Sequence, residues 1–157
     1  MNIEIRPYQP SDHCDVVTLI TTIQQNEFGL PITYEDQPDL ADIPKFFDLF
    51  LVAVVSEKAI GSIGLKIIGD FAVIRKMFVA QENRGREQGI AQKLLMALEE
   101  EIAARGINKI YLGTTEFFTA AHRFYERNDY LEISMSDLPS DFPVMKIDTK
   151  FFCKINL

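Results

Sequence analysis

The stretch Lys76–Leu95, KMFVAQENRGREQGIAQKLL, decides the fold, because it leads from an apolar strand through a Gly- and Arg-containing turn into the most regular helix. An apolar stripe with helical spacing runs from Ile90 to Ile102 and predicts an amphipathic helix that ends before Gly106. The first N–H groups of such a helix have no partner within it, and the helix dipole favours an anion beside them. The segment therefore predicts a strand, an anion-binding turn and a helix.

Short β-rich runs precede this segment and predict an antiparallel meander of three strands, Phe50–Val55, Ile60–Ile68 and Phe71–Val79. Gly69-Asp70 between the last two strands is typical of a tight hairpin, in which glycine supplies a positive φ. Beyond the long helix, Ile110–Leu112 predicts a strand that is reached by a crossover and lies parallel to the third strand of the meander.

The flanking segments complete one α/β domain over residues 1–157, with a mixed sheet flanked by helices. They predict a first strand, an amphipathic helix containing Val16 to Ile23, an irregular stretch, a second amphipathic helix and two closing strands. The first strand is expected at Ile3–Arg6 and the irregular stretch at Asn26–Pro44. The second amphipathic helix is expected at Glu116–Arg127, and the two closing strands at Tyr130–Ile133 and Lys150–Ile155. The aromatic last strand is a candidate for pairing with a second subunit, which would make a homodimer.

Composition excludes several classes of protein. With 157 residues, 47% of them hydrophobic and 25% charged, the chain has the composition of one well-cored soluble domain. A net charge of −7 argues against nucleic acid as a partner. The sequence has no apolar run near the ~18 residues of a membrane span, no secretory signal pattern and no metal-ligand spacing, so we expect a cytoplasmic protein without a metal.

Two segments resemble the GCN5-related N-acetyltransferase (GNAT) superfamily. Arg86–Ala91, REQGIA, matches its R/Q-x-x-G-x-G/A signature in the required place between a strand and a helix, and Ala121–Tyr130, AHRFYERNDY, resembles its A-x-x-[LF]-Y-E-[KR]-x-G-[FY] signature. The chain departs from the family by two extra residues between Val79 and Gly89. It also has Phe118 where many members have Asn, and Asp129 instead of the usual Gly.

The resemblance implies the mixed, mostly antiparallel GNAT fold and transfer of an acetyl group from acetyl-CoA to an amine in a ternary complex. Backbone groups around Phe78 and Val79 would hold the pantetheine arm and the thioester. The residues implied to hold the pyrophosphate are Arg84, Gly85, Arg86, Gln88, Gly89, Ile90 and Ala91. Tyr125 matches the tyrosine beside the cofactor sulfur and would donate a proton to the departing thiolate. Alternatively, Tyr125 is a half-buried core aromatic.

The general base and the acceptor are less defined. Glu27 is the candidate base, because the irregular stretch after the first helix forms one wall of the acceptor groove in the family; alternatively it is a solvated acid. Five acids of that region predict a small cationic amine as the acceptor: Glu27, Glu35, Asp36, Asp39 and Asp42.

Two other functions remain open at this point. The chain can be a non-catalytic domain of the same fold that binds acyl-CoA as a sensor or interaction module. It can also be an unrelated α/β anion-binding domain whose turn matches the signature by accident. Retention of both the Gly-rich turn and Tyr125 favours the enzyme.

Overall fold

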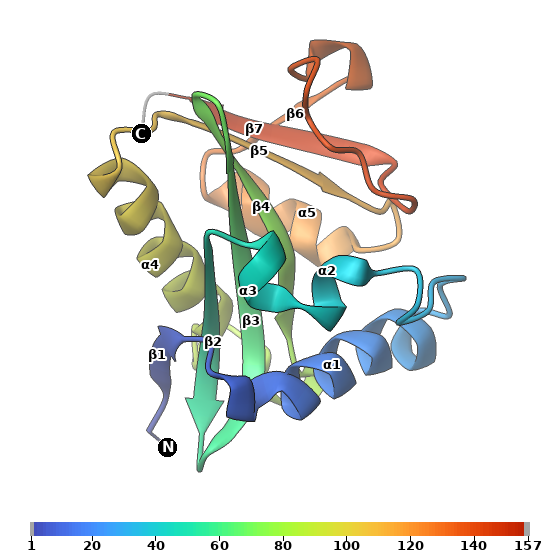
Figure 1. Cartoon of the computed structure of the whole chain (residues 1–157), viewed down its shortest axis with the longest axis vertical. Coiled ribbons are helices and arrows are strands. Elements are labelled where there is room, and N and C mark those ends of the chain that lie inside the picture. Colours follow the sequence, from blue (N-terminus) through green and yellow to red (C-terminus); the bar gives the residue numbers. More distant parts are fainter. Residues whose placement is uncertain (1, 156–157) are drawn as a thin grey trace.

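The computed structural model describes residues 2–155, which form one seven-stranded sheet with the strand order β1-β2-β3-β4-β5-β7-β6 (Figure 1). Neighbouring strands are antiparallel except β4 and β5, as the crossover predicted. The strands are β1 (Glu4–Pro7), β2 (Leu49–Val55), β3 (Lys58–Ile68), β4 (Phe71–Val79), β5 (Lys109–Thr114), β6 (Leu131–Ile133) and β7 (Lys150–Ile155). The helices are α1 (His13–Thr21), α2 (Pro38–Ala41), α3 (Ile43–Phe46), α4 (Ile90–Ala104) and α5 (Thr119–Arg127).

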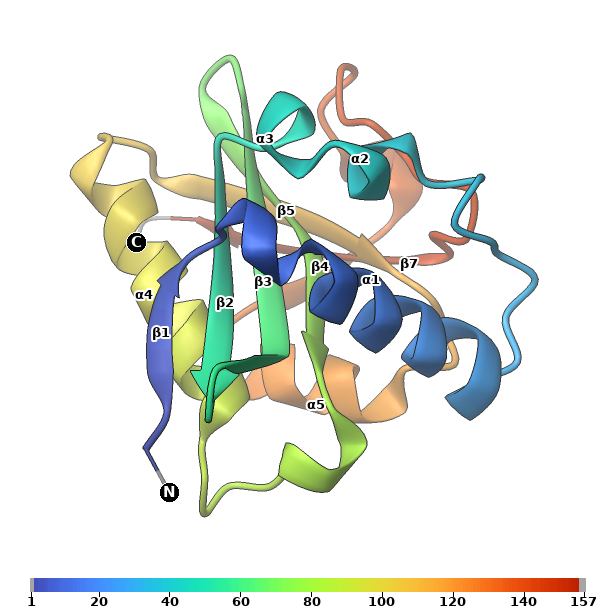
Figure 2. The ribbon, with the colours of Figure 1, turned by 60° about the horizontal axis from the view of Figure 1, so that its bottom comes forward.

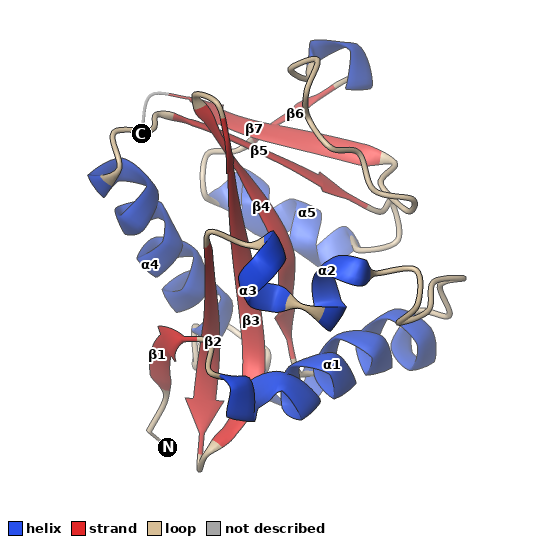
Figure 3. Ribbon diagram, viewed as in Figure 1, coloured by secondary structure: helices blue, strands red, loops and turns tan. Residues whose placement is uncertain are grey.

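Helices cover both faces of the sheet, with α1, α2 and α3 on one face and α4 and α5 on the other (Figures 2 and 3). The side chains of β2 alternate accordingly. Phe50 and Val52 pack with the first group of helices, whereas Leu51 and Ala53 belong to the cluster that contains the apolar stripe of α4. Within residues 2–155, no helix is long and apolar enough to cross a membrane.

The turns that glycine was expected to make are present. Gly69 has a φ of +57° in the hairpin between β3 and β4. Gly106 has a φ of +77° after the C-cap residue of α4, and the Ile107 N–H donates to the Ile102 carbonyl, as in a Schellman motif.

Strands β4 and β5 separate along their length, which opens the sheet. They pair only from Ala72↔Ile110 to Ile74↔Leu112, although β4 continues to Val79. Just beyond the last pair, the register between β3 and β4 shifts and Lys76 takes a φ of +56°, so β4 contains a bulge. The Ser62 Oγ donates to the Lys76 carbonyl at 2.7 Å and holds this bulge. Among the described residues, the edge of β4 that faces β5 therefore has no strand partner beyond Ile74.

Two predictions about the later part of the chain are wrong. Helix α5 begins at Thr119 rather than Glu116, because the Glu116 N–H donates to Thr149 Oγ1 and the residues before Thr119 form a turn. The last strand, β7, is not free to pair with a second subunit, because it lies between β5 and β6. The edge strands of the described sheet are β1 and β6.

The first helix continues beyond its α-helical part. Residues Thr22–Glu27 continue α1 as a π-helix, and the irregular stretch that follows contains only the short helices α2 and α3, as expected. The π-helix ends with Glu27 beside the turn that precedes α4, since its carboxylate contacts Arg84.

Candidate active site

A groove of about 670 Å³ lies between the end of β4, the turn before α4 and the helix α5. The residues expected to hold acetyl-CoA that line this groove are Phe78, Val79, Arg84, Gly85, Arg86, Gly89, Ile90 and Ala91. Gln88 is the exception. It does not line the groove, and its Oε1 is buried without a hydrogen-bond partner among the described residues.

The start of α4 presents free backbone donors to this groove. The Lys93 N–H is the first to bond back, to the Gly89 carbonyl at 2.9 Å, so the amides of Ile90, Ala91 and Gln92 precede the first bond of the helix. Gly89 has a φ of +60°, a conformation that costs a residue with a Cβ more than glycine. Free amides and flanking arginines suit a pyrophosphate.

Glu27 lies at this groove, paired with Arg84. Its two carboxylate oxygens accept hydrogen bonds from the Arg84 guanidinium at 2.6 and 2.8 Å, and Arg84 Nε also donates to the Val79 carbonyl at 2.9 Å. Each oxygen that a general base would use is therefore already bound to a cation. The assignment of Glu27 as the base stays a prediction, and this geometry favours a role in fixing Arg84.

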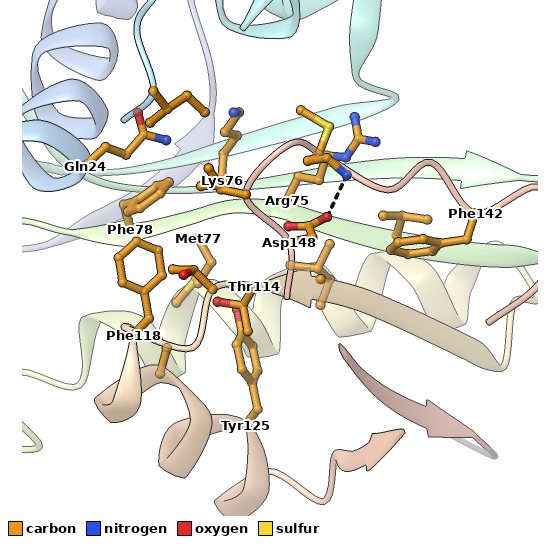
Figure 4. Close-up of a pocket in the computed structure, with 18 residues that line it drawn as sticks. Gln24, Arg75, Lys76, Met77, Phe78, Thr114, Phe118, Tyr125, Phe142 and Asp148 are labelled. Carbon is orange, nitrogen blue, oxygen red and sulfur yellow. Dashed lines mark hydrogen bonds between the residues drawn. The ribbon is translucent and has the colours of Figure 1, made fainter. Parts of the chain in front are cut away.

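A second, smaller cavity of about 80 Å³ lies where β4 and β5 separate (Figure 4). The two cavities are neighbours, because they share the lining residues Met77, Phe78, Phe118, Ala121 and Tyr125. Phe118 forms an aromatic wall at the junction, with ring centroids 4.8 Å from Phe28 and 6.0 Å from Phe78.

Tyr125 reaches the smaller cavity from α5, as Figure 4 shows. It is 5% exposed, and burial raises the pKa of its phenol, which keeps the hydroxyl protonated at neutral pH. Among the described residues the hydroxyl has no hydrogen-bond partner, so it is available to a ligand. Its position beside the cofactor sulfur and its role as an acid both stay predictions.

Two half-buried cations of β4 line the same cavity. Lys76 Nζ donates to Gln37 Oε1 at 2.6 Å, and Arg75 donates to the Pro143 carbonyl at 2.9 Å. The Asp39 carboxylate lies 3.6 Å from Lys76 Nζ and 3.7 Å from the Arg75 guanidinium. Burial lowers the pKa of both cations, and the negative charge of Asp39 acts against this shift.

Asp148 faces the cavity from the loop before β7. Its Oδ2 accepts the Met145 N–H at 2.8 Å, and its carboxylate rests on β5 where Gly113 lacks a side chain. A Cβ at Gly113 would lie 2.5 Å from that oxygen. Burial raises the pKa of Asp148 to about 6, although the Met145 N–H, Arg75 and Lys76 lower it.

Asp148, Arg75 and Lys76 are site residues that were not predicted from the sequence. Gly113 within a strand is the available signal, because it indicates that another group approaches the backbone closely. It does not say which group, and Asp148 lies far away in the sequence.

The five acids expected to wall the acceptor groove do not line the smaller cavity. Glu27 lies at the larger groove, and Asp39 is buried against Arg75 and Lys76. Asp36 lies 3.6 Å from Lys146, while Glu35 and Asp42 are exposed. The charged residues that line the smaller cavity are Arg75, Lys76 and Asp148, so it has no acidic wall from the irregular stretch among the described residues.

Comparisons with known proteins agree with this geometry. Residues 17–130 match the acetyltransferase (GNAT) family. An acetyltransferase of Pectobacterium atrosepticum is 37% identical over 123 residues, which are 71% of this chain and 86% of that protein. The N-acetylaspartate synthetase of Homo sapiens is 26% identical over 104 residues, 63% of this chain, and the match spans only 34% of that longer protein.

Solved structures share the whole architecture. A GNAT-family acetyltransferase from Staphylococcus aureus superimposes with a TM-score of 0.93 at 33% identity, over 98% of this chain and 99% of that one. The PaiA N-acetyltransferase from Thermoplasma acidophilum, solved in complex with coenzyme A, has a TM-score of 0.77 at 19% identity, over 99% of each chain. At that identity the second likeness concerns the fold alone. The matched signatures, the separated strands and these relatives together show that the chain belongs to the GNAT family of acetyltransferases.

Proposed function

We propose that this protein transfers the acetyl group of acetyl-CoA to the amine of a small acceptor by direct attack in a ternary complex. The observation that carries this proposal is the separation of β4 and β5, beside which the larger groove and the smaller cavity share lining residues. In this proposal the thioester of acetyl-CoA lies in the opening, with the rest of the cofactor on one side of the sheet and the acceptor amine on the other.

The larger groove suits coenzyme A. Its lining combines the free amides at the start of α4 with Arg84 and Arg86, which fit a pyrophosphate, and leads to the free edge of β4, which fits the amide groups of pantetheine. The coenzyme A bound by the Thermoplasma acidophilum enzyme supports the same use of this fold. Backbone donors of the bulged segment around Phe78 would stabilise the oxyanion that forms on the thioester carbonyl.

Tyr125 is the residue that we propose assists the leaving group. Its protonated phenol lines the junction of the two cavities, where the sulfur would lie. Proton donation to the departing thiolate completes the cleavage of the C–S bond.

The acceptor we propose is a small amine without further positive charge. A cavity of about 80 Å³ admits only a small group beside the thioester. Its lining carries the cations Arg75 and Lys76 against the single acid Asp148, so it does not attract a second positive charge. Because the acids of the irregular stretch do not line this cavity, they do not support a cationic acceptor there.

The proposal is tested by measuring CoA thiol release from acetyl-CoA with monoamines, amino acids, polyamines and aminoglycosides. We expect acceptor-dependent release, greatest with monoamines or amino acids, and loss of release in Gly89→Val, whose side chain obstructs the cofactor turn. Acetyl-CoA binding without release for any acceptor would identify a non-catalytic acyl-CoA-binding domain instead. Absence of both binding and release would exclude the acetyl-CoA assignment.

A further inference from the structure

We propose that Asp148 is the general base that removes a proton from the acceptor amine, in place of Glu27. This inference rests on the proposed function, since it concerns the acceptor side of the same reaction. Asp148 is a carboxylate that lines the smaller cavity together with Tyr125 and the free edge of β4.

The position of Asp148 suits an acceptor rather than the cofactor. Its carboxylate rests on Gly113, whose missing side chain would point to the face of the sheet opposite α5. Tyr125 approaches from α5, so the two groups lie on either side of the separated strands (Figure 4). A base on the acceptor side can take a proton from the incoming amine, and an acid on the cofactor side can give a proton to the departing thiolate.

The hydrogen bonds of Asp148 leave it able to take a proton. One oxygen accepts the Met145 N–H, and no guanidinium is bound to either oxygen among the described residues. Glu27, by contrast, is bound through both oxygens by Arg84. The two candidates therefore differ in whether an oxygen is open to the acceptor.

The charged groups around Asp148 keep it ionised near neutral pH. Arg75 and Lys76 of β4 face it and oppose the effect of burial, and Asp39 of α2 partly neutralises both of them. A carboxyl whose pKa is about 6 is mostly ionised at pH 7, yet it is basic enough to accept a proton from a bound ammonium.

Atoms and charges balance in the proposed reaction. The carboxylate of Asp148 takes one proton from the ammonium R–NH₃⁺, and the nitrogen lone pair forms the C–N bond with the thioester carbonyl carbon. The carbonyl π electrons move to oxygen and return as the C–S bond breaks, leaving thiolate. The second nitrogen proton replaces the one that Tyr125 gives to sulfur, so the products are the N-acetyl amine, CoA thiol and one proton released from Asp148.

The test compares the pH dependence of kcat/KM for wild type, Asp148→Asn and Glu27→Gln, using the best acceptor found in the release assay. For Asp148→Asn we expect a fall of ~10²-fold at neutral pH and loss of the acidic limb that wild type shows near pH 6. The remaining activity should rise with the fraction of unprotonated acceptor, so the difference from wild type narrows at high pH. Glu27→Gln should raise the KM for acetyl-CoA and keep the acidic limb.

Asp141→Asn is the matched control, because Asp141 is an exposed acid of the same loop. Its pH profile should equal that of wild type. Loss of the acidic limb in Glu27→Gln but not in Asp148→Asn would overturn the proposal, as would a decrease in Asp148→Asn that is equal at every pH. An inactive wild type would instead refute the proposed function, so the two failures are distinguishable.

Discussion

The contact between Gly113 and Asp148 shows how a single missing side chain shapes the proposed reaction centre. Because Gly113 has no Cβ, the carboxylate of Asp148 lies directly on β5 and is partly withdrawn from water. This position is unfavourable for an ionised group, which is why burial raises its pKa. A carboxylate kept in such a place for catalysis should reduce the stability of the fold.

We therefore predict that Asp148→Asn stabilises the protein, and only at the higher pH. The pKa of Asp148 is about 6 in the folded chain, against an ordinary value of 3.8. The native state thus binds more protons than the unfolded state between these values, so its stability falls as pH rises through this window. Denaturation at about pH 8 should show a gain of about 1 to 3 kcal/mol for the variant, and little gain at about pH 4. An equal change at both pH values would refute the prediction.

Tyr125→Phe tests the proposed proton donor. The substitution keeps the ring and its packing against Tyr130 and Phe152 but removes the hydroxyl, so we expect kcat to fall ~10²-fold with unchanged affinity for acetyl-CoA. Tyr130→Phe is the control, because its hydroxyl donates to Glu99 rather than lining either cavity. If steady-state and single-turnover rates both match wild type, Tyr125 only packs.

The end of α5 illustrates what a family signature means in physical terms. Asp129 replaces the glycine of that signature and has a φ of +70°. The Tyr130 N–H donates to the Tyr125 carbonyl, and the Asp129 N–H donates to the Glu126 carbonyl, which together make a Schellman motif. The motif ends the helix at Arg127 and uses the backbone carbonyl of Tyr125, the proposed acid.

We predict that Asp129→Gly stabilises the protein by ~1 kcal/mol, because glycine adopts this left-handed conformation without the cost that a Cβ imposes. Thermal or chemical unfolding would measure the gain. Asp129→Ala separates backbone strain from charge, since it removes the same carboxylate but retains a Cβ. Equal stabilisation by both variants would show that charge, and not conformation, is responsible.

The separation of β4 and β5 was only partly predictable from the sequence. The order of strands, the long helix and the Gly-rich turn follow from periodicity and local turn chemistry. The bulge in β4 has no such signal, because Lys76 rather than glycine takes the positive φ there. It is stabilised by a bond from Ser62, in the neighbouring strand.

The acceptor side was not predictable for a related reason. Asp148 meets β4 and β5 only through tertiary packing, and Arg84 pairs with Glu27 across 57 positions of sequence. Local patterns report which residues prefer a helix or a strand, whereas such contacts depend on how loops close over the sheet. The turn before α4 was predictable because its residues follow one another in the sequence.

Charge is unevenly distributed over the whole molecule, and this explains how an acidic protein can bind an anionic cofactor. The chain has a net charge of −7. The larger groove is nevertheless lined by Arg84, Arg86 and Arg127, and Glu27 is the single acid of that lining. The local field at the groove is therefore positive against a negative background.

This distribution predicts how acetyl-CoA binding depends on salt. Acetyl-CoA should raise the midpoint of thermal unfolding, because it binds the folded state, and the shift should shrink as salt screens the exposed Arg86 over a Debye length of ~10 Å. Arg86→Ala should reduce both the shift and its salt dependence. Arg123→Ala, which removes an exposed arginine of α5 outside the groove, should leave both nearly unchanged. A shift that is independent of salt in wild type would mean that uncharged contacts dominate binding and that the positive lining does not attract the cofactor.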